Sequence, residues 1–216
     1  MNTLERNAIF IKNTLIIIGA GGHGKVVADI AIKMNKWSSI AFLDDDASIR
    51  ESMGVKVIGT IDEAFTYAGE ADFFVAIGNN KMREAIQERL IGEGLKVTSL
   101  IHPHAVIGTD VEIGIGSAVM AGVVINSSSR IGKGCIINTS ASLDHDNHME
   151  DYVHISPGVH TAGGVSIGKG TWAGIGSTIN NNVRICSGCI IGAGAAVVRD
   201  VAEPGVYAGV PARRMG

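Results

Sequence analysis

A six-residue repeat in the second half of the chain restricts its possible folds more than any other feature. Counting every sixth residue from Ile107 to Val197 gives sixteen positions, and fourteen of them hold Ile, Val, Leu or Met. The residue after each position is often Gly, Asn or Asp, and the residue two places before it is usually small or β-branched. Three such repeats close one triangular coil, with the aliphatic side chains stacked inside it. The repeat therefore predicts a parallel β-helix of about five coils across residues 102–216.

The composition agrees with a core of thin aliphatic layers. The chain has 29 glycines but only five Phe, three Tyr and two Trp residues. At an ordinary usage of about 7 %, a chain of this length would have about 15 glycines. Gly, Asn and Asp suit corners where φ is positive. The flat faces and open ends of such a coil expose sheet surface, so we expect the protein to self-associate.

Residues 1–101 have a different pattern, in which short apolar runs alternate with helical periodicity. This alternation is typical of a parallel sheet with helices on its faces and predicts a Rossmann-like α/β domain. The predicted strands are residues 15–19, 40–45, 55–59, 73–79 and 96–101, and the predicted helices are residues 25–34, 61–68 and 80–92. In the first helix, Val26, Val27, Ile30 and Met34 are expected on one apolar face.

The turn after the first predicted strand has the pattern G-x-G-x-x-G, from Gly19 to Gly24. Glycine lets the backbone approach a phosphate, and the N-terminus of the next helix offers N–H groups to it. Asp44 ends the second predicted strand, where its carboxylate can accept a hydrogen bond from a ribose or a base. Because a full dinucleotide fold has a second half, we expect one nucleotide with a short attached group rather than NAD.

Charge, hydropathy and cysteine content argue against several classes of function. The net charge of −3 gives no electrostatic basis for binding nucleic acid. No apolar run approaches the roughly 18 residues of a membrane span. The first residues, which include Glu5, Arg6 and Lys12, are interpreted as mature chain rather than as a signal peptide. Three cysteines, an odd number, fit a reducing cytoplasm better than a disulfide framework.

The repeat is unusually polar between residues 138 and 164, and this is where we expect the chemistry. His145 stands between Asp144 and Asp146. A carboxylate beside a histidine fixes its tautomer and raises its basicity, as a general base requires. Gly163 follows one coil later, so we expect it above His145, where a backbone N–H can stabilise a developing oxyanion.

Two other interpretations of this segment remain open from residue types alone. Some hexapeptide β-helices are purely structural or bind ice, and ionisable residues would be superfluous in such a protein. Others hold zinc between subunits. The spacing of His145, His148, His154 and His160 matches no known ligand pattern. Cys186-x-x-Cys189 looks like half of a zinc motif, but Cys189 falls on the inward small position of the repeat, which favours core or surface filling. We therefore expect no metal.

The chain resembles the bacterial nucleotide-sugar N-acetyltransferases over residues 14–215. These enzymes acetylate the 4-amino group of UDP-linked bacillosamine precursors or of GDP-perosamine, and they are related to acetyltransferases of sialic acid pathways. The matching motifs are GAGGHGKVV (19–27), FLDD (42–45), AIGNN (76–80), LIHP (100–103), NTS (138–140), DHD (144–146), HISPG (154–158) and AGVPARRM (208–215).

The resemblance implies a homotrimer of left-handed β-helices with N-terminal Rossmann-like domains that hold the nucleotide sugar. Acetyl-coenzyme A would lie between neighbouring β-helices. His145 would be the base and Asp146 its orienting partner, a position where some relatives have Glu. The implied substrate-binding residues are Gly21, Gly22, His23, Asp44, Asp45, Gly78, Asn79, Asn80 and Asn138. The implied acetyl-coenzyme A-binding residues are His154, Gly163, Ala193 and Arg213, and some relatives have Gly in place of Ala193.

The expected reaction is direct transfer of the acetyl group to the sugar amine. None of the three cysteines stands beside a plausible base in the sequence, so a covalent acyl-enzyme has no support. Two alternatives remain: transfer to a sugar hydroxyl, as in O-acetylation of a sialic acid, and a trimeric binding module without activity. The FLDD and GNN motifs favour a nucleotide-linked acceptor, but neither the base nor the sugar follows from the sequence.

Overall fold

The computed structural model describes residues 13–216, which form two compact units that divide between Leu100 and Ile101. The prediction placed this boundary one residue later. The interpretation of the first twelve residues as mature chain lies outside the described residues. Within residues 13–216, no helix is both long and apolar enough to cross a membrane.

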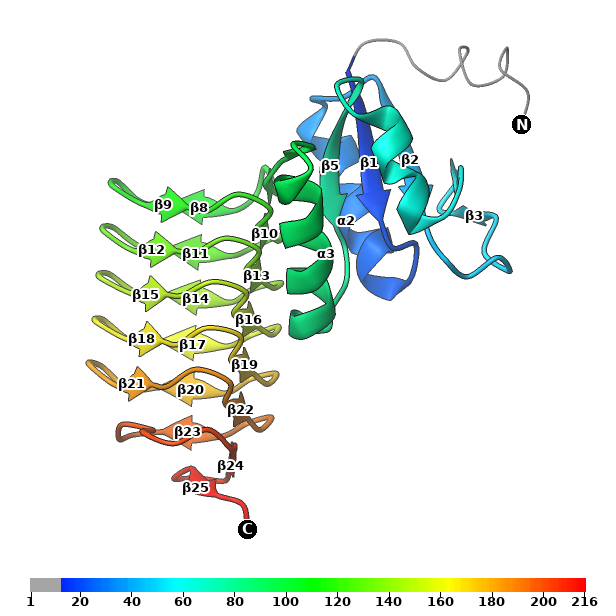
Figure 1. Cartoon of the computed structure of the whole chain (residues 1–216). Coiled ribbons are helices and arrows are strands. Elements are labelled where there is room, and N and C mark those ends of the chain that lie inside the picture. The colour runs from blue at the N-terminus through cyan, green and yellow to red at the C-terminus, as the bar shows by residue number, and fades with distance from the viewer. Residues whose placement is uncertain (1–12) are drawn as a thin grey trace. The chain divides into compact units, whose positions relative to one another are not determined.

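The first unit is a four-stranded parallel sheet in the order β2-β1-β5-β6 (Figure 1). Its strands are β1 (Thr14–Ile18), β2 (Ser39–Leu43), β5 (Ala71–Val75) and β6 (Lys96–Val97). Its helices are α2 (Gly22–Met34), the 3-10 helix η1 (Ile61–Tyr67) and α3 (Asn80–Gly92). A hairpin of β3 (Glu51–Ser52) and β4 (Val55–Lys56) completes it. The predicted Rossmann-like α/β class is confirmed.

Three local predictions for this unit are wrong in part. Residues 55–59 form no strand of the main sheet, because β4 pairs with β3 and only Val57 bridges to Phe42. Residues 96–101 divide into β6 and β7 (Leu100–Ile101), and β7 begins the sheet of the second unit. In α2 the buried residues are Gly24, Val27, Ala28, Ile30 and Ala31, so a face of mainly small residues packs inward while Val26 stays 41 % exposed.

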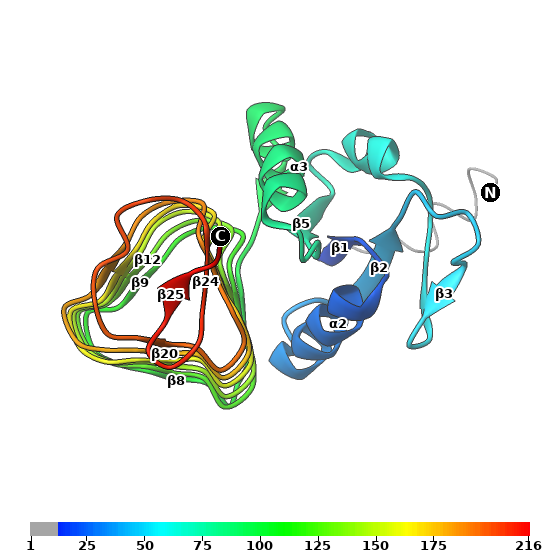
Figure 2. The same ribbon diagram turned by 90° about the horizontal axis from the view of Figure 1, so that it is seen from below.

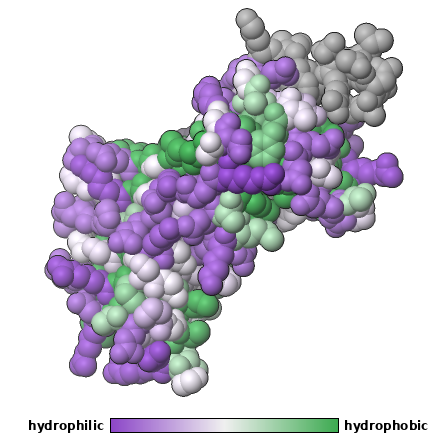
Figure 3. All heavy atoms as spheres, viewed as in Figure 1, coloured by the Kyte–Doolittle hydropathy of each residue, from purple (hydrophilic) through white to green (hydrophobic). Residues whose placement is uncertain are grey.

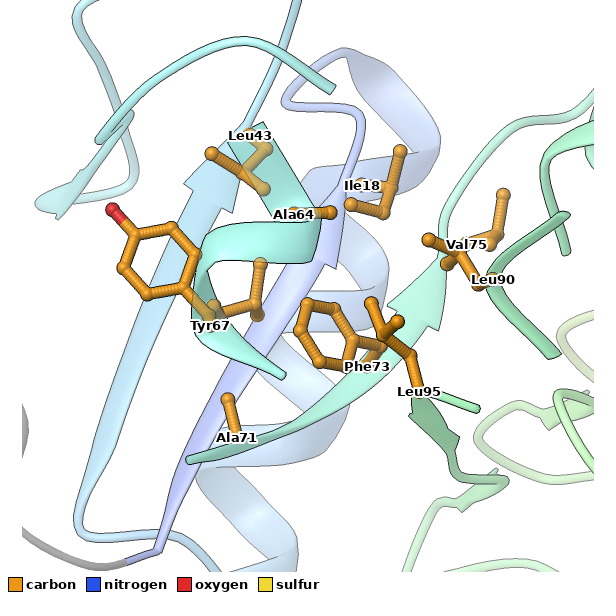
Figure 4. Packing of buried hydrophobic residues seen from close by; sticks show 10 residues of the cluster. Ile18, Leu43, Ala64, Tyr67, Ala71, Phe73, Val75, Leu90 and Leu95 are labelled. Carbon is orange, nitrogen blue, oxygen red and sulfur yellow. The ribbon is translucent and has the colours of Figure 1, made fainter. Parts of the chain in front are cut away.

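One cluster of buried side chains holds η1 and α3 against the sheet. Figure 4 shows Ile18, Leu43, Phe73 and Val75 of the strands meeting Ala64 and Tyr67 of η1 and Leu90 of α3. Phe73 and the strand aliphatic residues are fully buried. This packing fixes the positions of the loops at the carboxyl ends of β1, β2 and β5.

The second unit is a left-handed parallel β-helix whose coils superpose as a triangle when viewed along its axis (Figure 2). The first face contains β7, β10 (Ala118–Val119), β13 (Ile136–Ile137), β16 (His154–Ile155), β19 (Trp172–Ala173), β22 (Ile190–Ile191), β24 (Val206–Ala208) and β25 (Arg213–Arg214). The second face contains β8 (Val106–Ile107), β11 (Val124–Ile125), β14 (Ser142–Leu143), β17 (His160–Thr161), β20 (Thr178–Ile179) and β23 (Ala196–Val197). The third face contains β9 (Glu112–Ile113), β12 (Arg130–Ile131), β15 (His148–Met149), β18 (Ser166–Ile167) and β21 (Arg184–Ile185).

The pairing confirms the expected vertical stacking of the repeat. Ile125 pairs with Ile107 in the preceding coil and with Leu143 in the following coil, and the column continues through Thr161 and Ile179. Leu143 is fully buried, and Ile179 is 2 % exposed. On the side seen in Figure 3, the surface of the β-helix is mostly hydrophilic, with smaller hydrophobic patches. Burial of the aliphatic column stabilises the unit by roughly 1.5–3 kcal/mol per side chain.

The corner glycines have two separate roles, positive φ and close contact between coils, and the sequence predicted only the first. Positive φ recurs every six residues from Asp110 to Gly194, three residues after each inward aliphatic side chain, and Asp146 (φ 58°) holds one of these places. The glycines directly after the aliphatic residues have other φ values. A Cβ on Gly168 would lie 2.4 Å from the backbone nitrogen of Ser187, so close contact between coils demands glycine there.

Candidate active site

His145 lies at a corner between the second and third faces, which we call the His145 corner and which comprises residues 126–129, 144–147, 162–165 and 180–183. The imidazole Nδ1 is 2.7 Å from Oδ2 of Asp146, and both side chains are more than 60 % exposed. On the other flank, Asp144 Oδ1 accepts hydrogen bonds from the His145 backbone N–H and from the Asn126 amide, each at 2.9 Å. This arrangement holds the ring while leaving it open to a substrate.

The carboxylates change the acid–base properties of the corner. The hydrogen bond with Asp146, followed by the charge of Asp144, raises the pKa of His145 above its ordinary value. Hydrogen bonds from Asn126 and from the His145 backbone hold the pKa of Asp144 below its ordinary value. If Asp146 accepts from Nδ1–H, the neutral imidazole presents an unprotonated Nε2, the form that a general base needs.

Gly163 lies against the face of this imidazole, as the eighteen-residue spacing predicts. A Cβ on Gly163 would lie 2.6 Å from both Cε1 and Nε2 of His145. Gly164 N–H donates to the His145 carbonyl at 2.9 Å, which binds the two coils together. Within residues 13–216, the Gly163 N–H has no hydrogen-bond partner. A free donor beside an imidazole that can accept a proton is the pairing that an acyl transfer site requires.

Replacement of Asp146 by Asn is expected to lower kcat and to move the acidic limb of the pH–rate profile to lower pH. The sign follows from the geometry: Asp146 raises the pKa of His145, so its removal lets the imidazole lose its proton at lower pH. The measurement is kcat across pH 5–9 for the acetyl transfer that the resemblance implies. In Glu112→Gln, which removes an exposed carboxylate from β9, the limb should stay in place. An unmoved limb in D146N would contradict this assignment.

The second set of predicted residues lies on three loops at the carboxyl ends of neighbouring strands in the first unit. Gly19 N–H donates to the Leu43 carbonyl and Ala76 N–H donates to the Ile18 carbonyl, each at 2.8 Å. Ligands of open α/β sheets bind at this edge, where the chain leaves adjacent strands in opposite directions. The structure therefore brings together the glycine turn, the residues after β2 and the residues after β5.

The four glycines of the turn divide into two pairs. A Cβ on Gly24 would lie 2.1 Å from the Gly19 carbonyl oxygen, and Gly19 has φ of +100°. These two glycines are required for the fold. Gly21 and Gly22 are exposed, and a Cβ on either would meet nothing within 4 Å. The open pair lies at the start of α2, where backbone N–H groups attract anions.

The two carboxylates after β2 have partners within the protein. Asp44 accepts from the backbone N–H of Ala20 at 2.7 Å through Oδ2 and from that of Asp46 at 2.9 Å through Oδ1. Asp45 accepts from the Ile61 N–H at the start of η1 at 2.9 Å. Asp44 therefore orders the glycine turn, and Asp45 fixes η1. The sequence predicted ribose or base contacts for Asp44 and Asp45, but it did not predict these hydrogen bonds within the protein.

The third loop contains Gly78, Asn79 and Asn80. Asn79 caps α3 through its side-chain oxygen, which accepts from the Met82 N–H at 3.0 Å. The fully buried Arg83 donates to the Gly78 carbonyl at 3.1 Å and to Oδ1 of Asn80 at 2.8 Å. The sequence prediction missed Arg83, because a charged residue in a helix normally faces solvent. The loop is thus held from within its own unit.

His23 differs from what a phosphate-binding histidine would provide. Burial, followed by the charge of Arg83, lowers the pKa of His23 to about 4. Its Nε2 is buried and has no hydrogen-bond partner among the described residues. The ring is therefore neutral at neutral pH and adds no positive charge toward a diphosphate, so Gly21 and Gly22 are the stronger candidates.

Two glycine substitutions are expected to separate binding from folding. In Gly22→Ala the new methyl group occupies open space above the turn, so the protein should fold normally. The methyl group would hold a phosphate away from the backbone N–H groups, and loss of one hydrogen bond to a charged phosphate costs about 1.5–3 kcal/mol. This corresponds to at least about a tenfold rise in KM for the nucleotide sugar that the resemblance implies. Gly24→Ala overlaps the Gly19 carbonyl and should lower the free energy of unfolding by about 1–3 kcal/mol. Thermal unfolding and KM measurements check both, and equal destabilisation of the two variants would contradict the division.

The remaining predicted residues lie away from His145 in the same chain. Asn138 and Ala193 belong to the corner between the first and second faces, at the opposite end of the second face from the His145 corner. His154 lies on the first face, stacked on Trp172 with ring centroids 5.8 Å apart. Arg213 is exposed in β25, which pairs with β24 rather than fraying. One chain thus brings His145, Asp146 and Gly163 together but leaves Asn138 and Ala193 at a separate corner.

The cysteines and acidic residues add no further centre. All three cysteines are free, and the Sγ atoms of Cys186 and Cys189 are 3.4 Å apart. Burial is the main cause that raises the pKa of Cys189 to about 12, so this thiol is a poor nucleophile. Residues 13–216 contain no group of three or more His, Cys, Asp or Glu side chains suited to a metal ion.

The second unit is a β-helix of hexapeptide repeats with a histidine–carboxylate pair at one corner, and the first unit is an α/β domain of the nucleotide-binding type. Together they are typical of hexapeptide acyltransferases that act on nucleotide-linked acceptors. Residues 14–90 match the family model described as the PglD N-terminal domain. The chain is 30 % identical to GDP-perosamine N-acetyltransferase from Escherichia coli O157:H7, over 77 % of this chain and 78 % of that protein.

Two solved structures are similar over nearly the whole chain. The acetyltransferase domain of PglB from Neisseria gonorrhoeae in complex with acetyl coenzyme A is 39 % identical with a TM-score of 0.91, covering 95 % of this chain and 100 % of that one. A histidine-to-asparagine mutant of perosamine N-acetyltransferase from Caulobacter crescentus, in complex with CoA and GDP-perosamine, is 37 % identical with a TM-score of 0.90, covering 94 % and 97 %. The chain belongs to the nucleotide-sugar N-acetyltransferase family, and the predicted family and enzyme class are confirmed.

Proposed function

We propose that this protein transfers the acetyl group of acetyl-coenzyme A to the 4-amino group of a nucleotide-linked amino-deoxy sugar. Acetyl-coenzyme A is the acetyl donor. The observation that carries the proposal is the exposed His145–Asp146 pair, with Nδ1 and Oδ2 2.7 Å apart, facing the free N–H of Gly163. Membership of the family supports a nucleotide sugar as acceptor, and its base and sugar are left to experiment.

The proposed reaction needs no covalent enzyme intermediate. The sugar amine attacks the thioester carbonyl, and Nε2 of His145 takes the proton that the nitrogen loses. Asp146 holds Nδ1–H and stabilises the imidazolium that forms. The Gly163 N–H donates to the tetrahedral oxyanion. When the C–S bond breaks, the imidazolium returns its proton to the sulfur, so coenzyme A leaves as the thiol and His145 is again neutral.

The first unit is proposed to hold the nucleotide sugar. The open space above Gly21 and Gly22, at the start of α2, suits a diphosphate. The adjacent loop with Gly78, Asn79 and Asn80 would border the same ligand. Asp44 would order the turn through its 2.7 Å hydrogen bond from the Ala20 N–H. Its half-buried carboxylate would also accept a hydrogen bond from the ribose or the base.

A cytoplasmic homotrimer is the proposed assembly. Asn138 and Ala193 lie at a different corner from His145, so a site that uses all three needs the corner of a neighbouring chain. The exposed side chains of Trp172, Ile190 and Val206, stacked along the first face, also favour association. Mixing H145A and N138A chains tests this, with sedimentation and activity both measured on the mixture. Trimers that regain activity on mixing support the homotrimer, and an active wild-type monomer excludes it.

The experiment that tests the function is coenzyme A release over a panel of UDP-, GDP- and dTDP-linked 4-amino sugars, with the matching hydroxy sugars and free amino sugars alongside. We expect release with one family of nucleotide-linked amines and none with free amino sugars. Release with hydroxy sugars alone would indicate an O-acetyltransferase. No release with any acceptor would favour a binding module.

A further inference from the structure

Asn147 is an exception to the composition of the β-helix core. It occupies the inward position two residues before Met149, and it is 1 % exposed. The same position holds Ser129 in the preceding coil and Val165 and Val183 in the two following coils, and all three are buried. Of the sixteen such positions from Ala105 to Ala195, this one alone holds an amide. Its Oδ1 is buried without a hydrogen-bond partner among the described residues. An unpaired buried oxygen costs stability, so the residue calls for a functional explanation.

The amide nitrogen of Asn147 supplies that explanation. Nδ2 donates to the Asp144 carbonyl at 2.7 Å and, more weakly, to the His145 carbonyl at 3.3 Å. It also donates to the Ala162 carbonyl, in the next coil, at 2.9 Å. One side chain therefore joins the backbone that carries the base to the backbone that carries Gly163.

The bond to Ala162 sets the direction of the proposed oxyanion donor. The Ala162–Gly163 peptide is trans, so its C=O and N–H point in opposite directions. Because the carbonyl points inward to the buried Asn147, the Gly163 N–H points outward, to the side on which the imidazole lies. The position of Asn147 thus influences both the His145 imidazole and the Gly163 N–H without contacting either substrate.

We propose that Asn147 is a positioning residue that sets the Gly163 N–H against the His145 base. The inference rests on the proposed acetyl transfer and names a residue behind its site. Serine residues elsewhere in the core make part of the same contact: Ser129 donates to Asp144 and Ser117 donates to Gly132, each fifteen residues ahead. A serine at position 147 can therefore keep the bond to Ala162 but lacks a second donor for the His145 corner.

The test compares Asn147→Val and Asn147→Ser with the wild type. Valine fits, since Val165 and Val183 fill the same column. It removes the unpaired oxygen but also the donor to the Ala162 carbonyl, and because these two effects oppose each other the midpoint of thermal unfolding should change little. We expect kcat to fall about tenfold to a hundredfold in N147V, since small misplacements of catalytic groups have effects of this size. N147S should lie between N147V and the wild type, and KM for acetyl-coenzyme A should change less than kcat in both.

Ser117→Val is the matched control. It removes the same kind of bond, together with the acceptor of the Cys135 N–H, from a buried core position at another corner, where Val153 shows that valine fits. Its kcat should stay within about twofold of the wild type, well below the effect expected at position 147. Wild-type-like kcat in N147V, or an equal fall in S117V, would overturn the inference while acetyl transfer by the wild type stands. If N147V fails to fold, the order of kcat for N147S and the wild type decides. A wild type that acetylates no nucleotide sugar would overturn the proposed function itself, and the inference with it.

Discussion

Replacing His145 by alanine is expected to lower kcat by about a hundredfold to ten-thousandfold, the range that general bases contribute. The imidazole is 63 % exposed and fills no part of the core, so the midpoint of thermal unfolding should hardly change. The measurement is the rate of coenzyme A release at saturating acetyl-coenzyme A and nucleotide sugar. KM values should change less than kcat, because the lost interaction acts in the transition state.

His148→Gln is the control for this substitution. His148 lies three residues further on, exposed on β15 of the third face, where its pairing partners are Arg130 and Ser166. It should keep the wild-type rate. Near-normal transfer by H145A would show that another group takes the proton, and equal losses in both variants would indicate a general effect on the β-helix.

Replacing Gly163 by alanine is the second substitution with a large expected effect. The new methyl carbon would lie 2.6 Å from Cε1 and Nε2 of His145 and would touch no backbone atom among its three nearest neighbours. The imidazole can move away only by leaving its position beside Asp146. A displaced base next to a crowded oxyanion donor should lower kcat about a hundredfold, while the coil itself stays folded.

Gly168→Ala separates this local effect from damage to the fold. A Cβ there would lie within 2.4 Å of the Ser187 nitrogen, so backbone has to move and the midpoint of thermal unfolding should fall. G163A should show the reverse combination, with low kcat and a normal midpoint. A crystal structure of G163A is expected to show the imidazole turned from Asp146. An unmoved ring with full activity would contradict the role given to this corner.

The β-helix could be predicted from the sequence because its determinants repeat. Each inward residue, such as Ile125 or Leu143, is specified by the same six-residue period, and coil stacking follows from that period without any distant contact. The first unit was predicted less well where tertiary contacts decide. The strand expected at 55–59 pairs as a hairpin instead, and residues 96–101 are shared between β6 and the first strand of the β-helix.

The candidate site shows the same difference. His145, Asp146 and Gly163 could be placed together from the sequence, since the coil length brings positions eighteen residues apart into contact. The same spacing relates Asn126 to Asp144 and could have revealed that bond. Arg83 and the low pKa of His23 depend on side-chain burial in the first unit, which no periodic pattern records.

A competition experiment distinguishes direct acetylation of a nucleotide-linked amine from the other reactions. The protein is incubated with acetyl-coenzyme A and equal amounts of a nucleotide 4-amino sugar and its 4-hydroxy counterpart. The masses of the products and of the protein are then measured by mass spectrometry. We predict that every coenzyme A released matches one nucleotide amino sugar heavier by one acetyl group, with the amide resistant to hydroxylamine and the protein unmodified. Acetylation of the hydroxy sugar would show an O-acetyltransferase, and an acetyl group left on the protein would show a covalent intermediate in place of direct transfer.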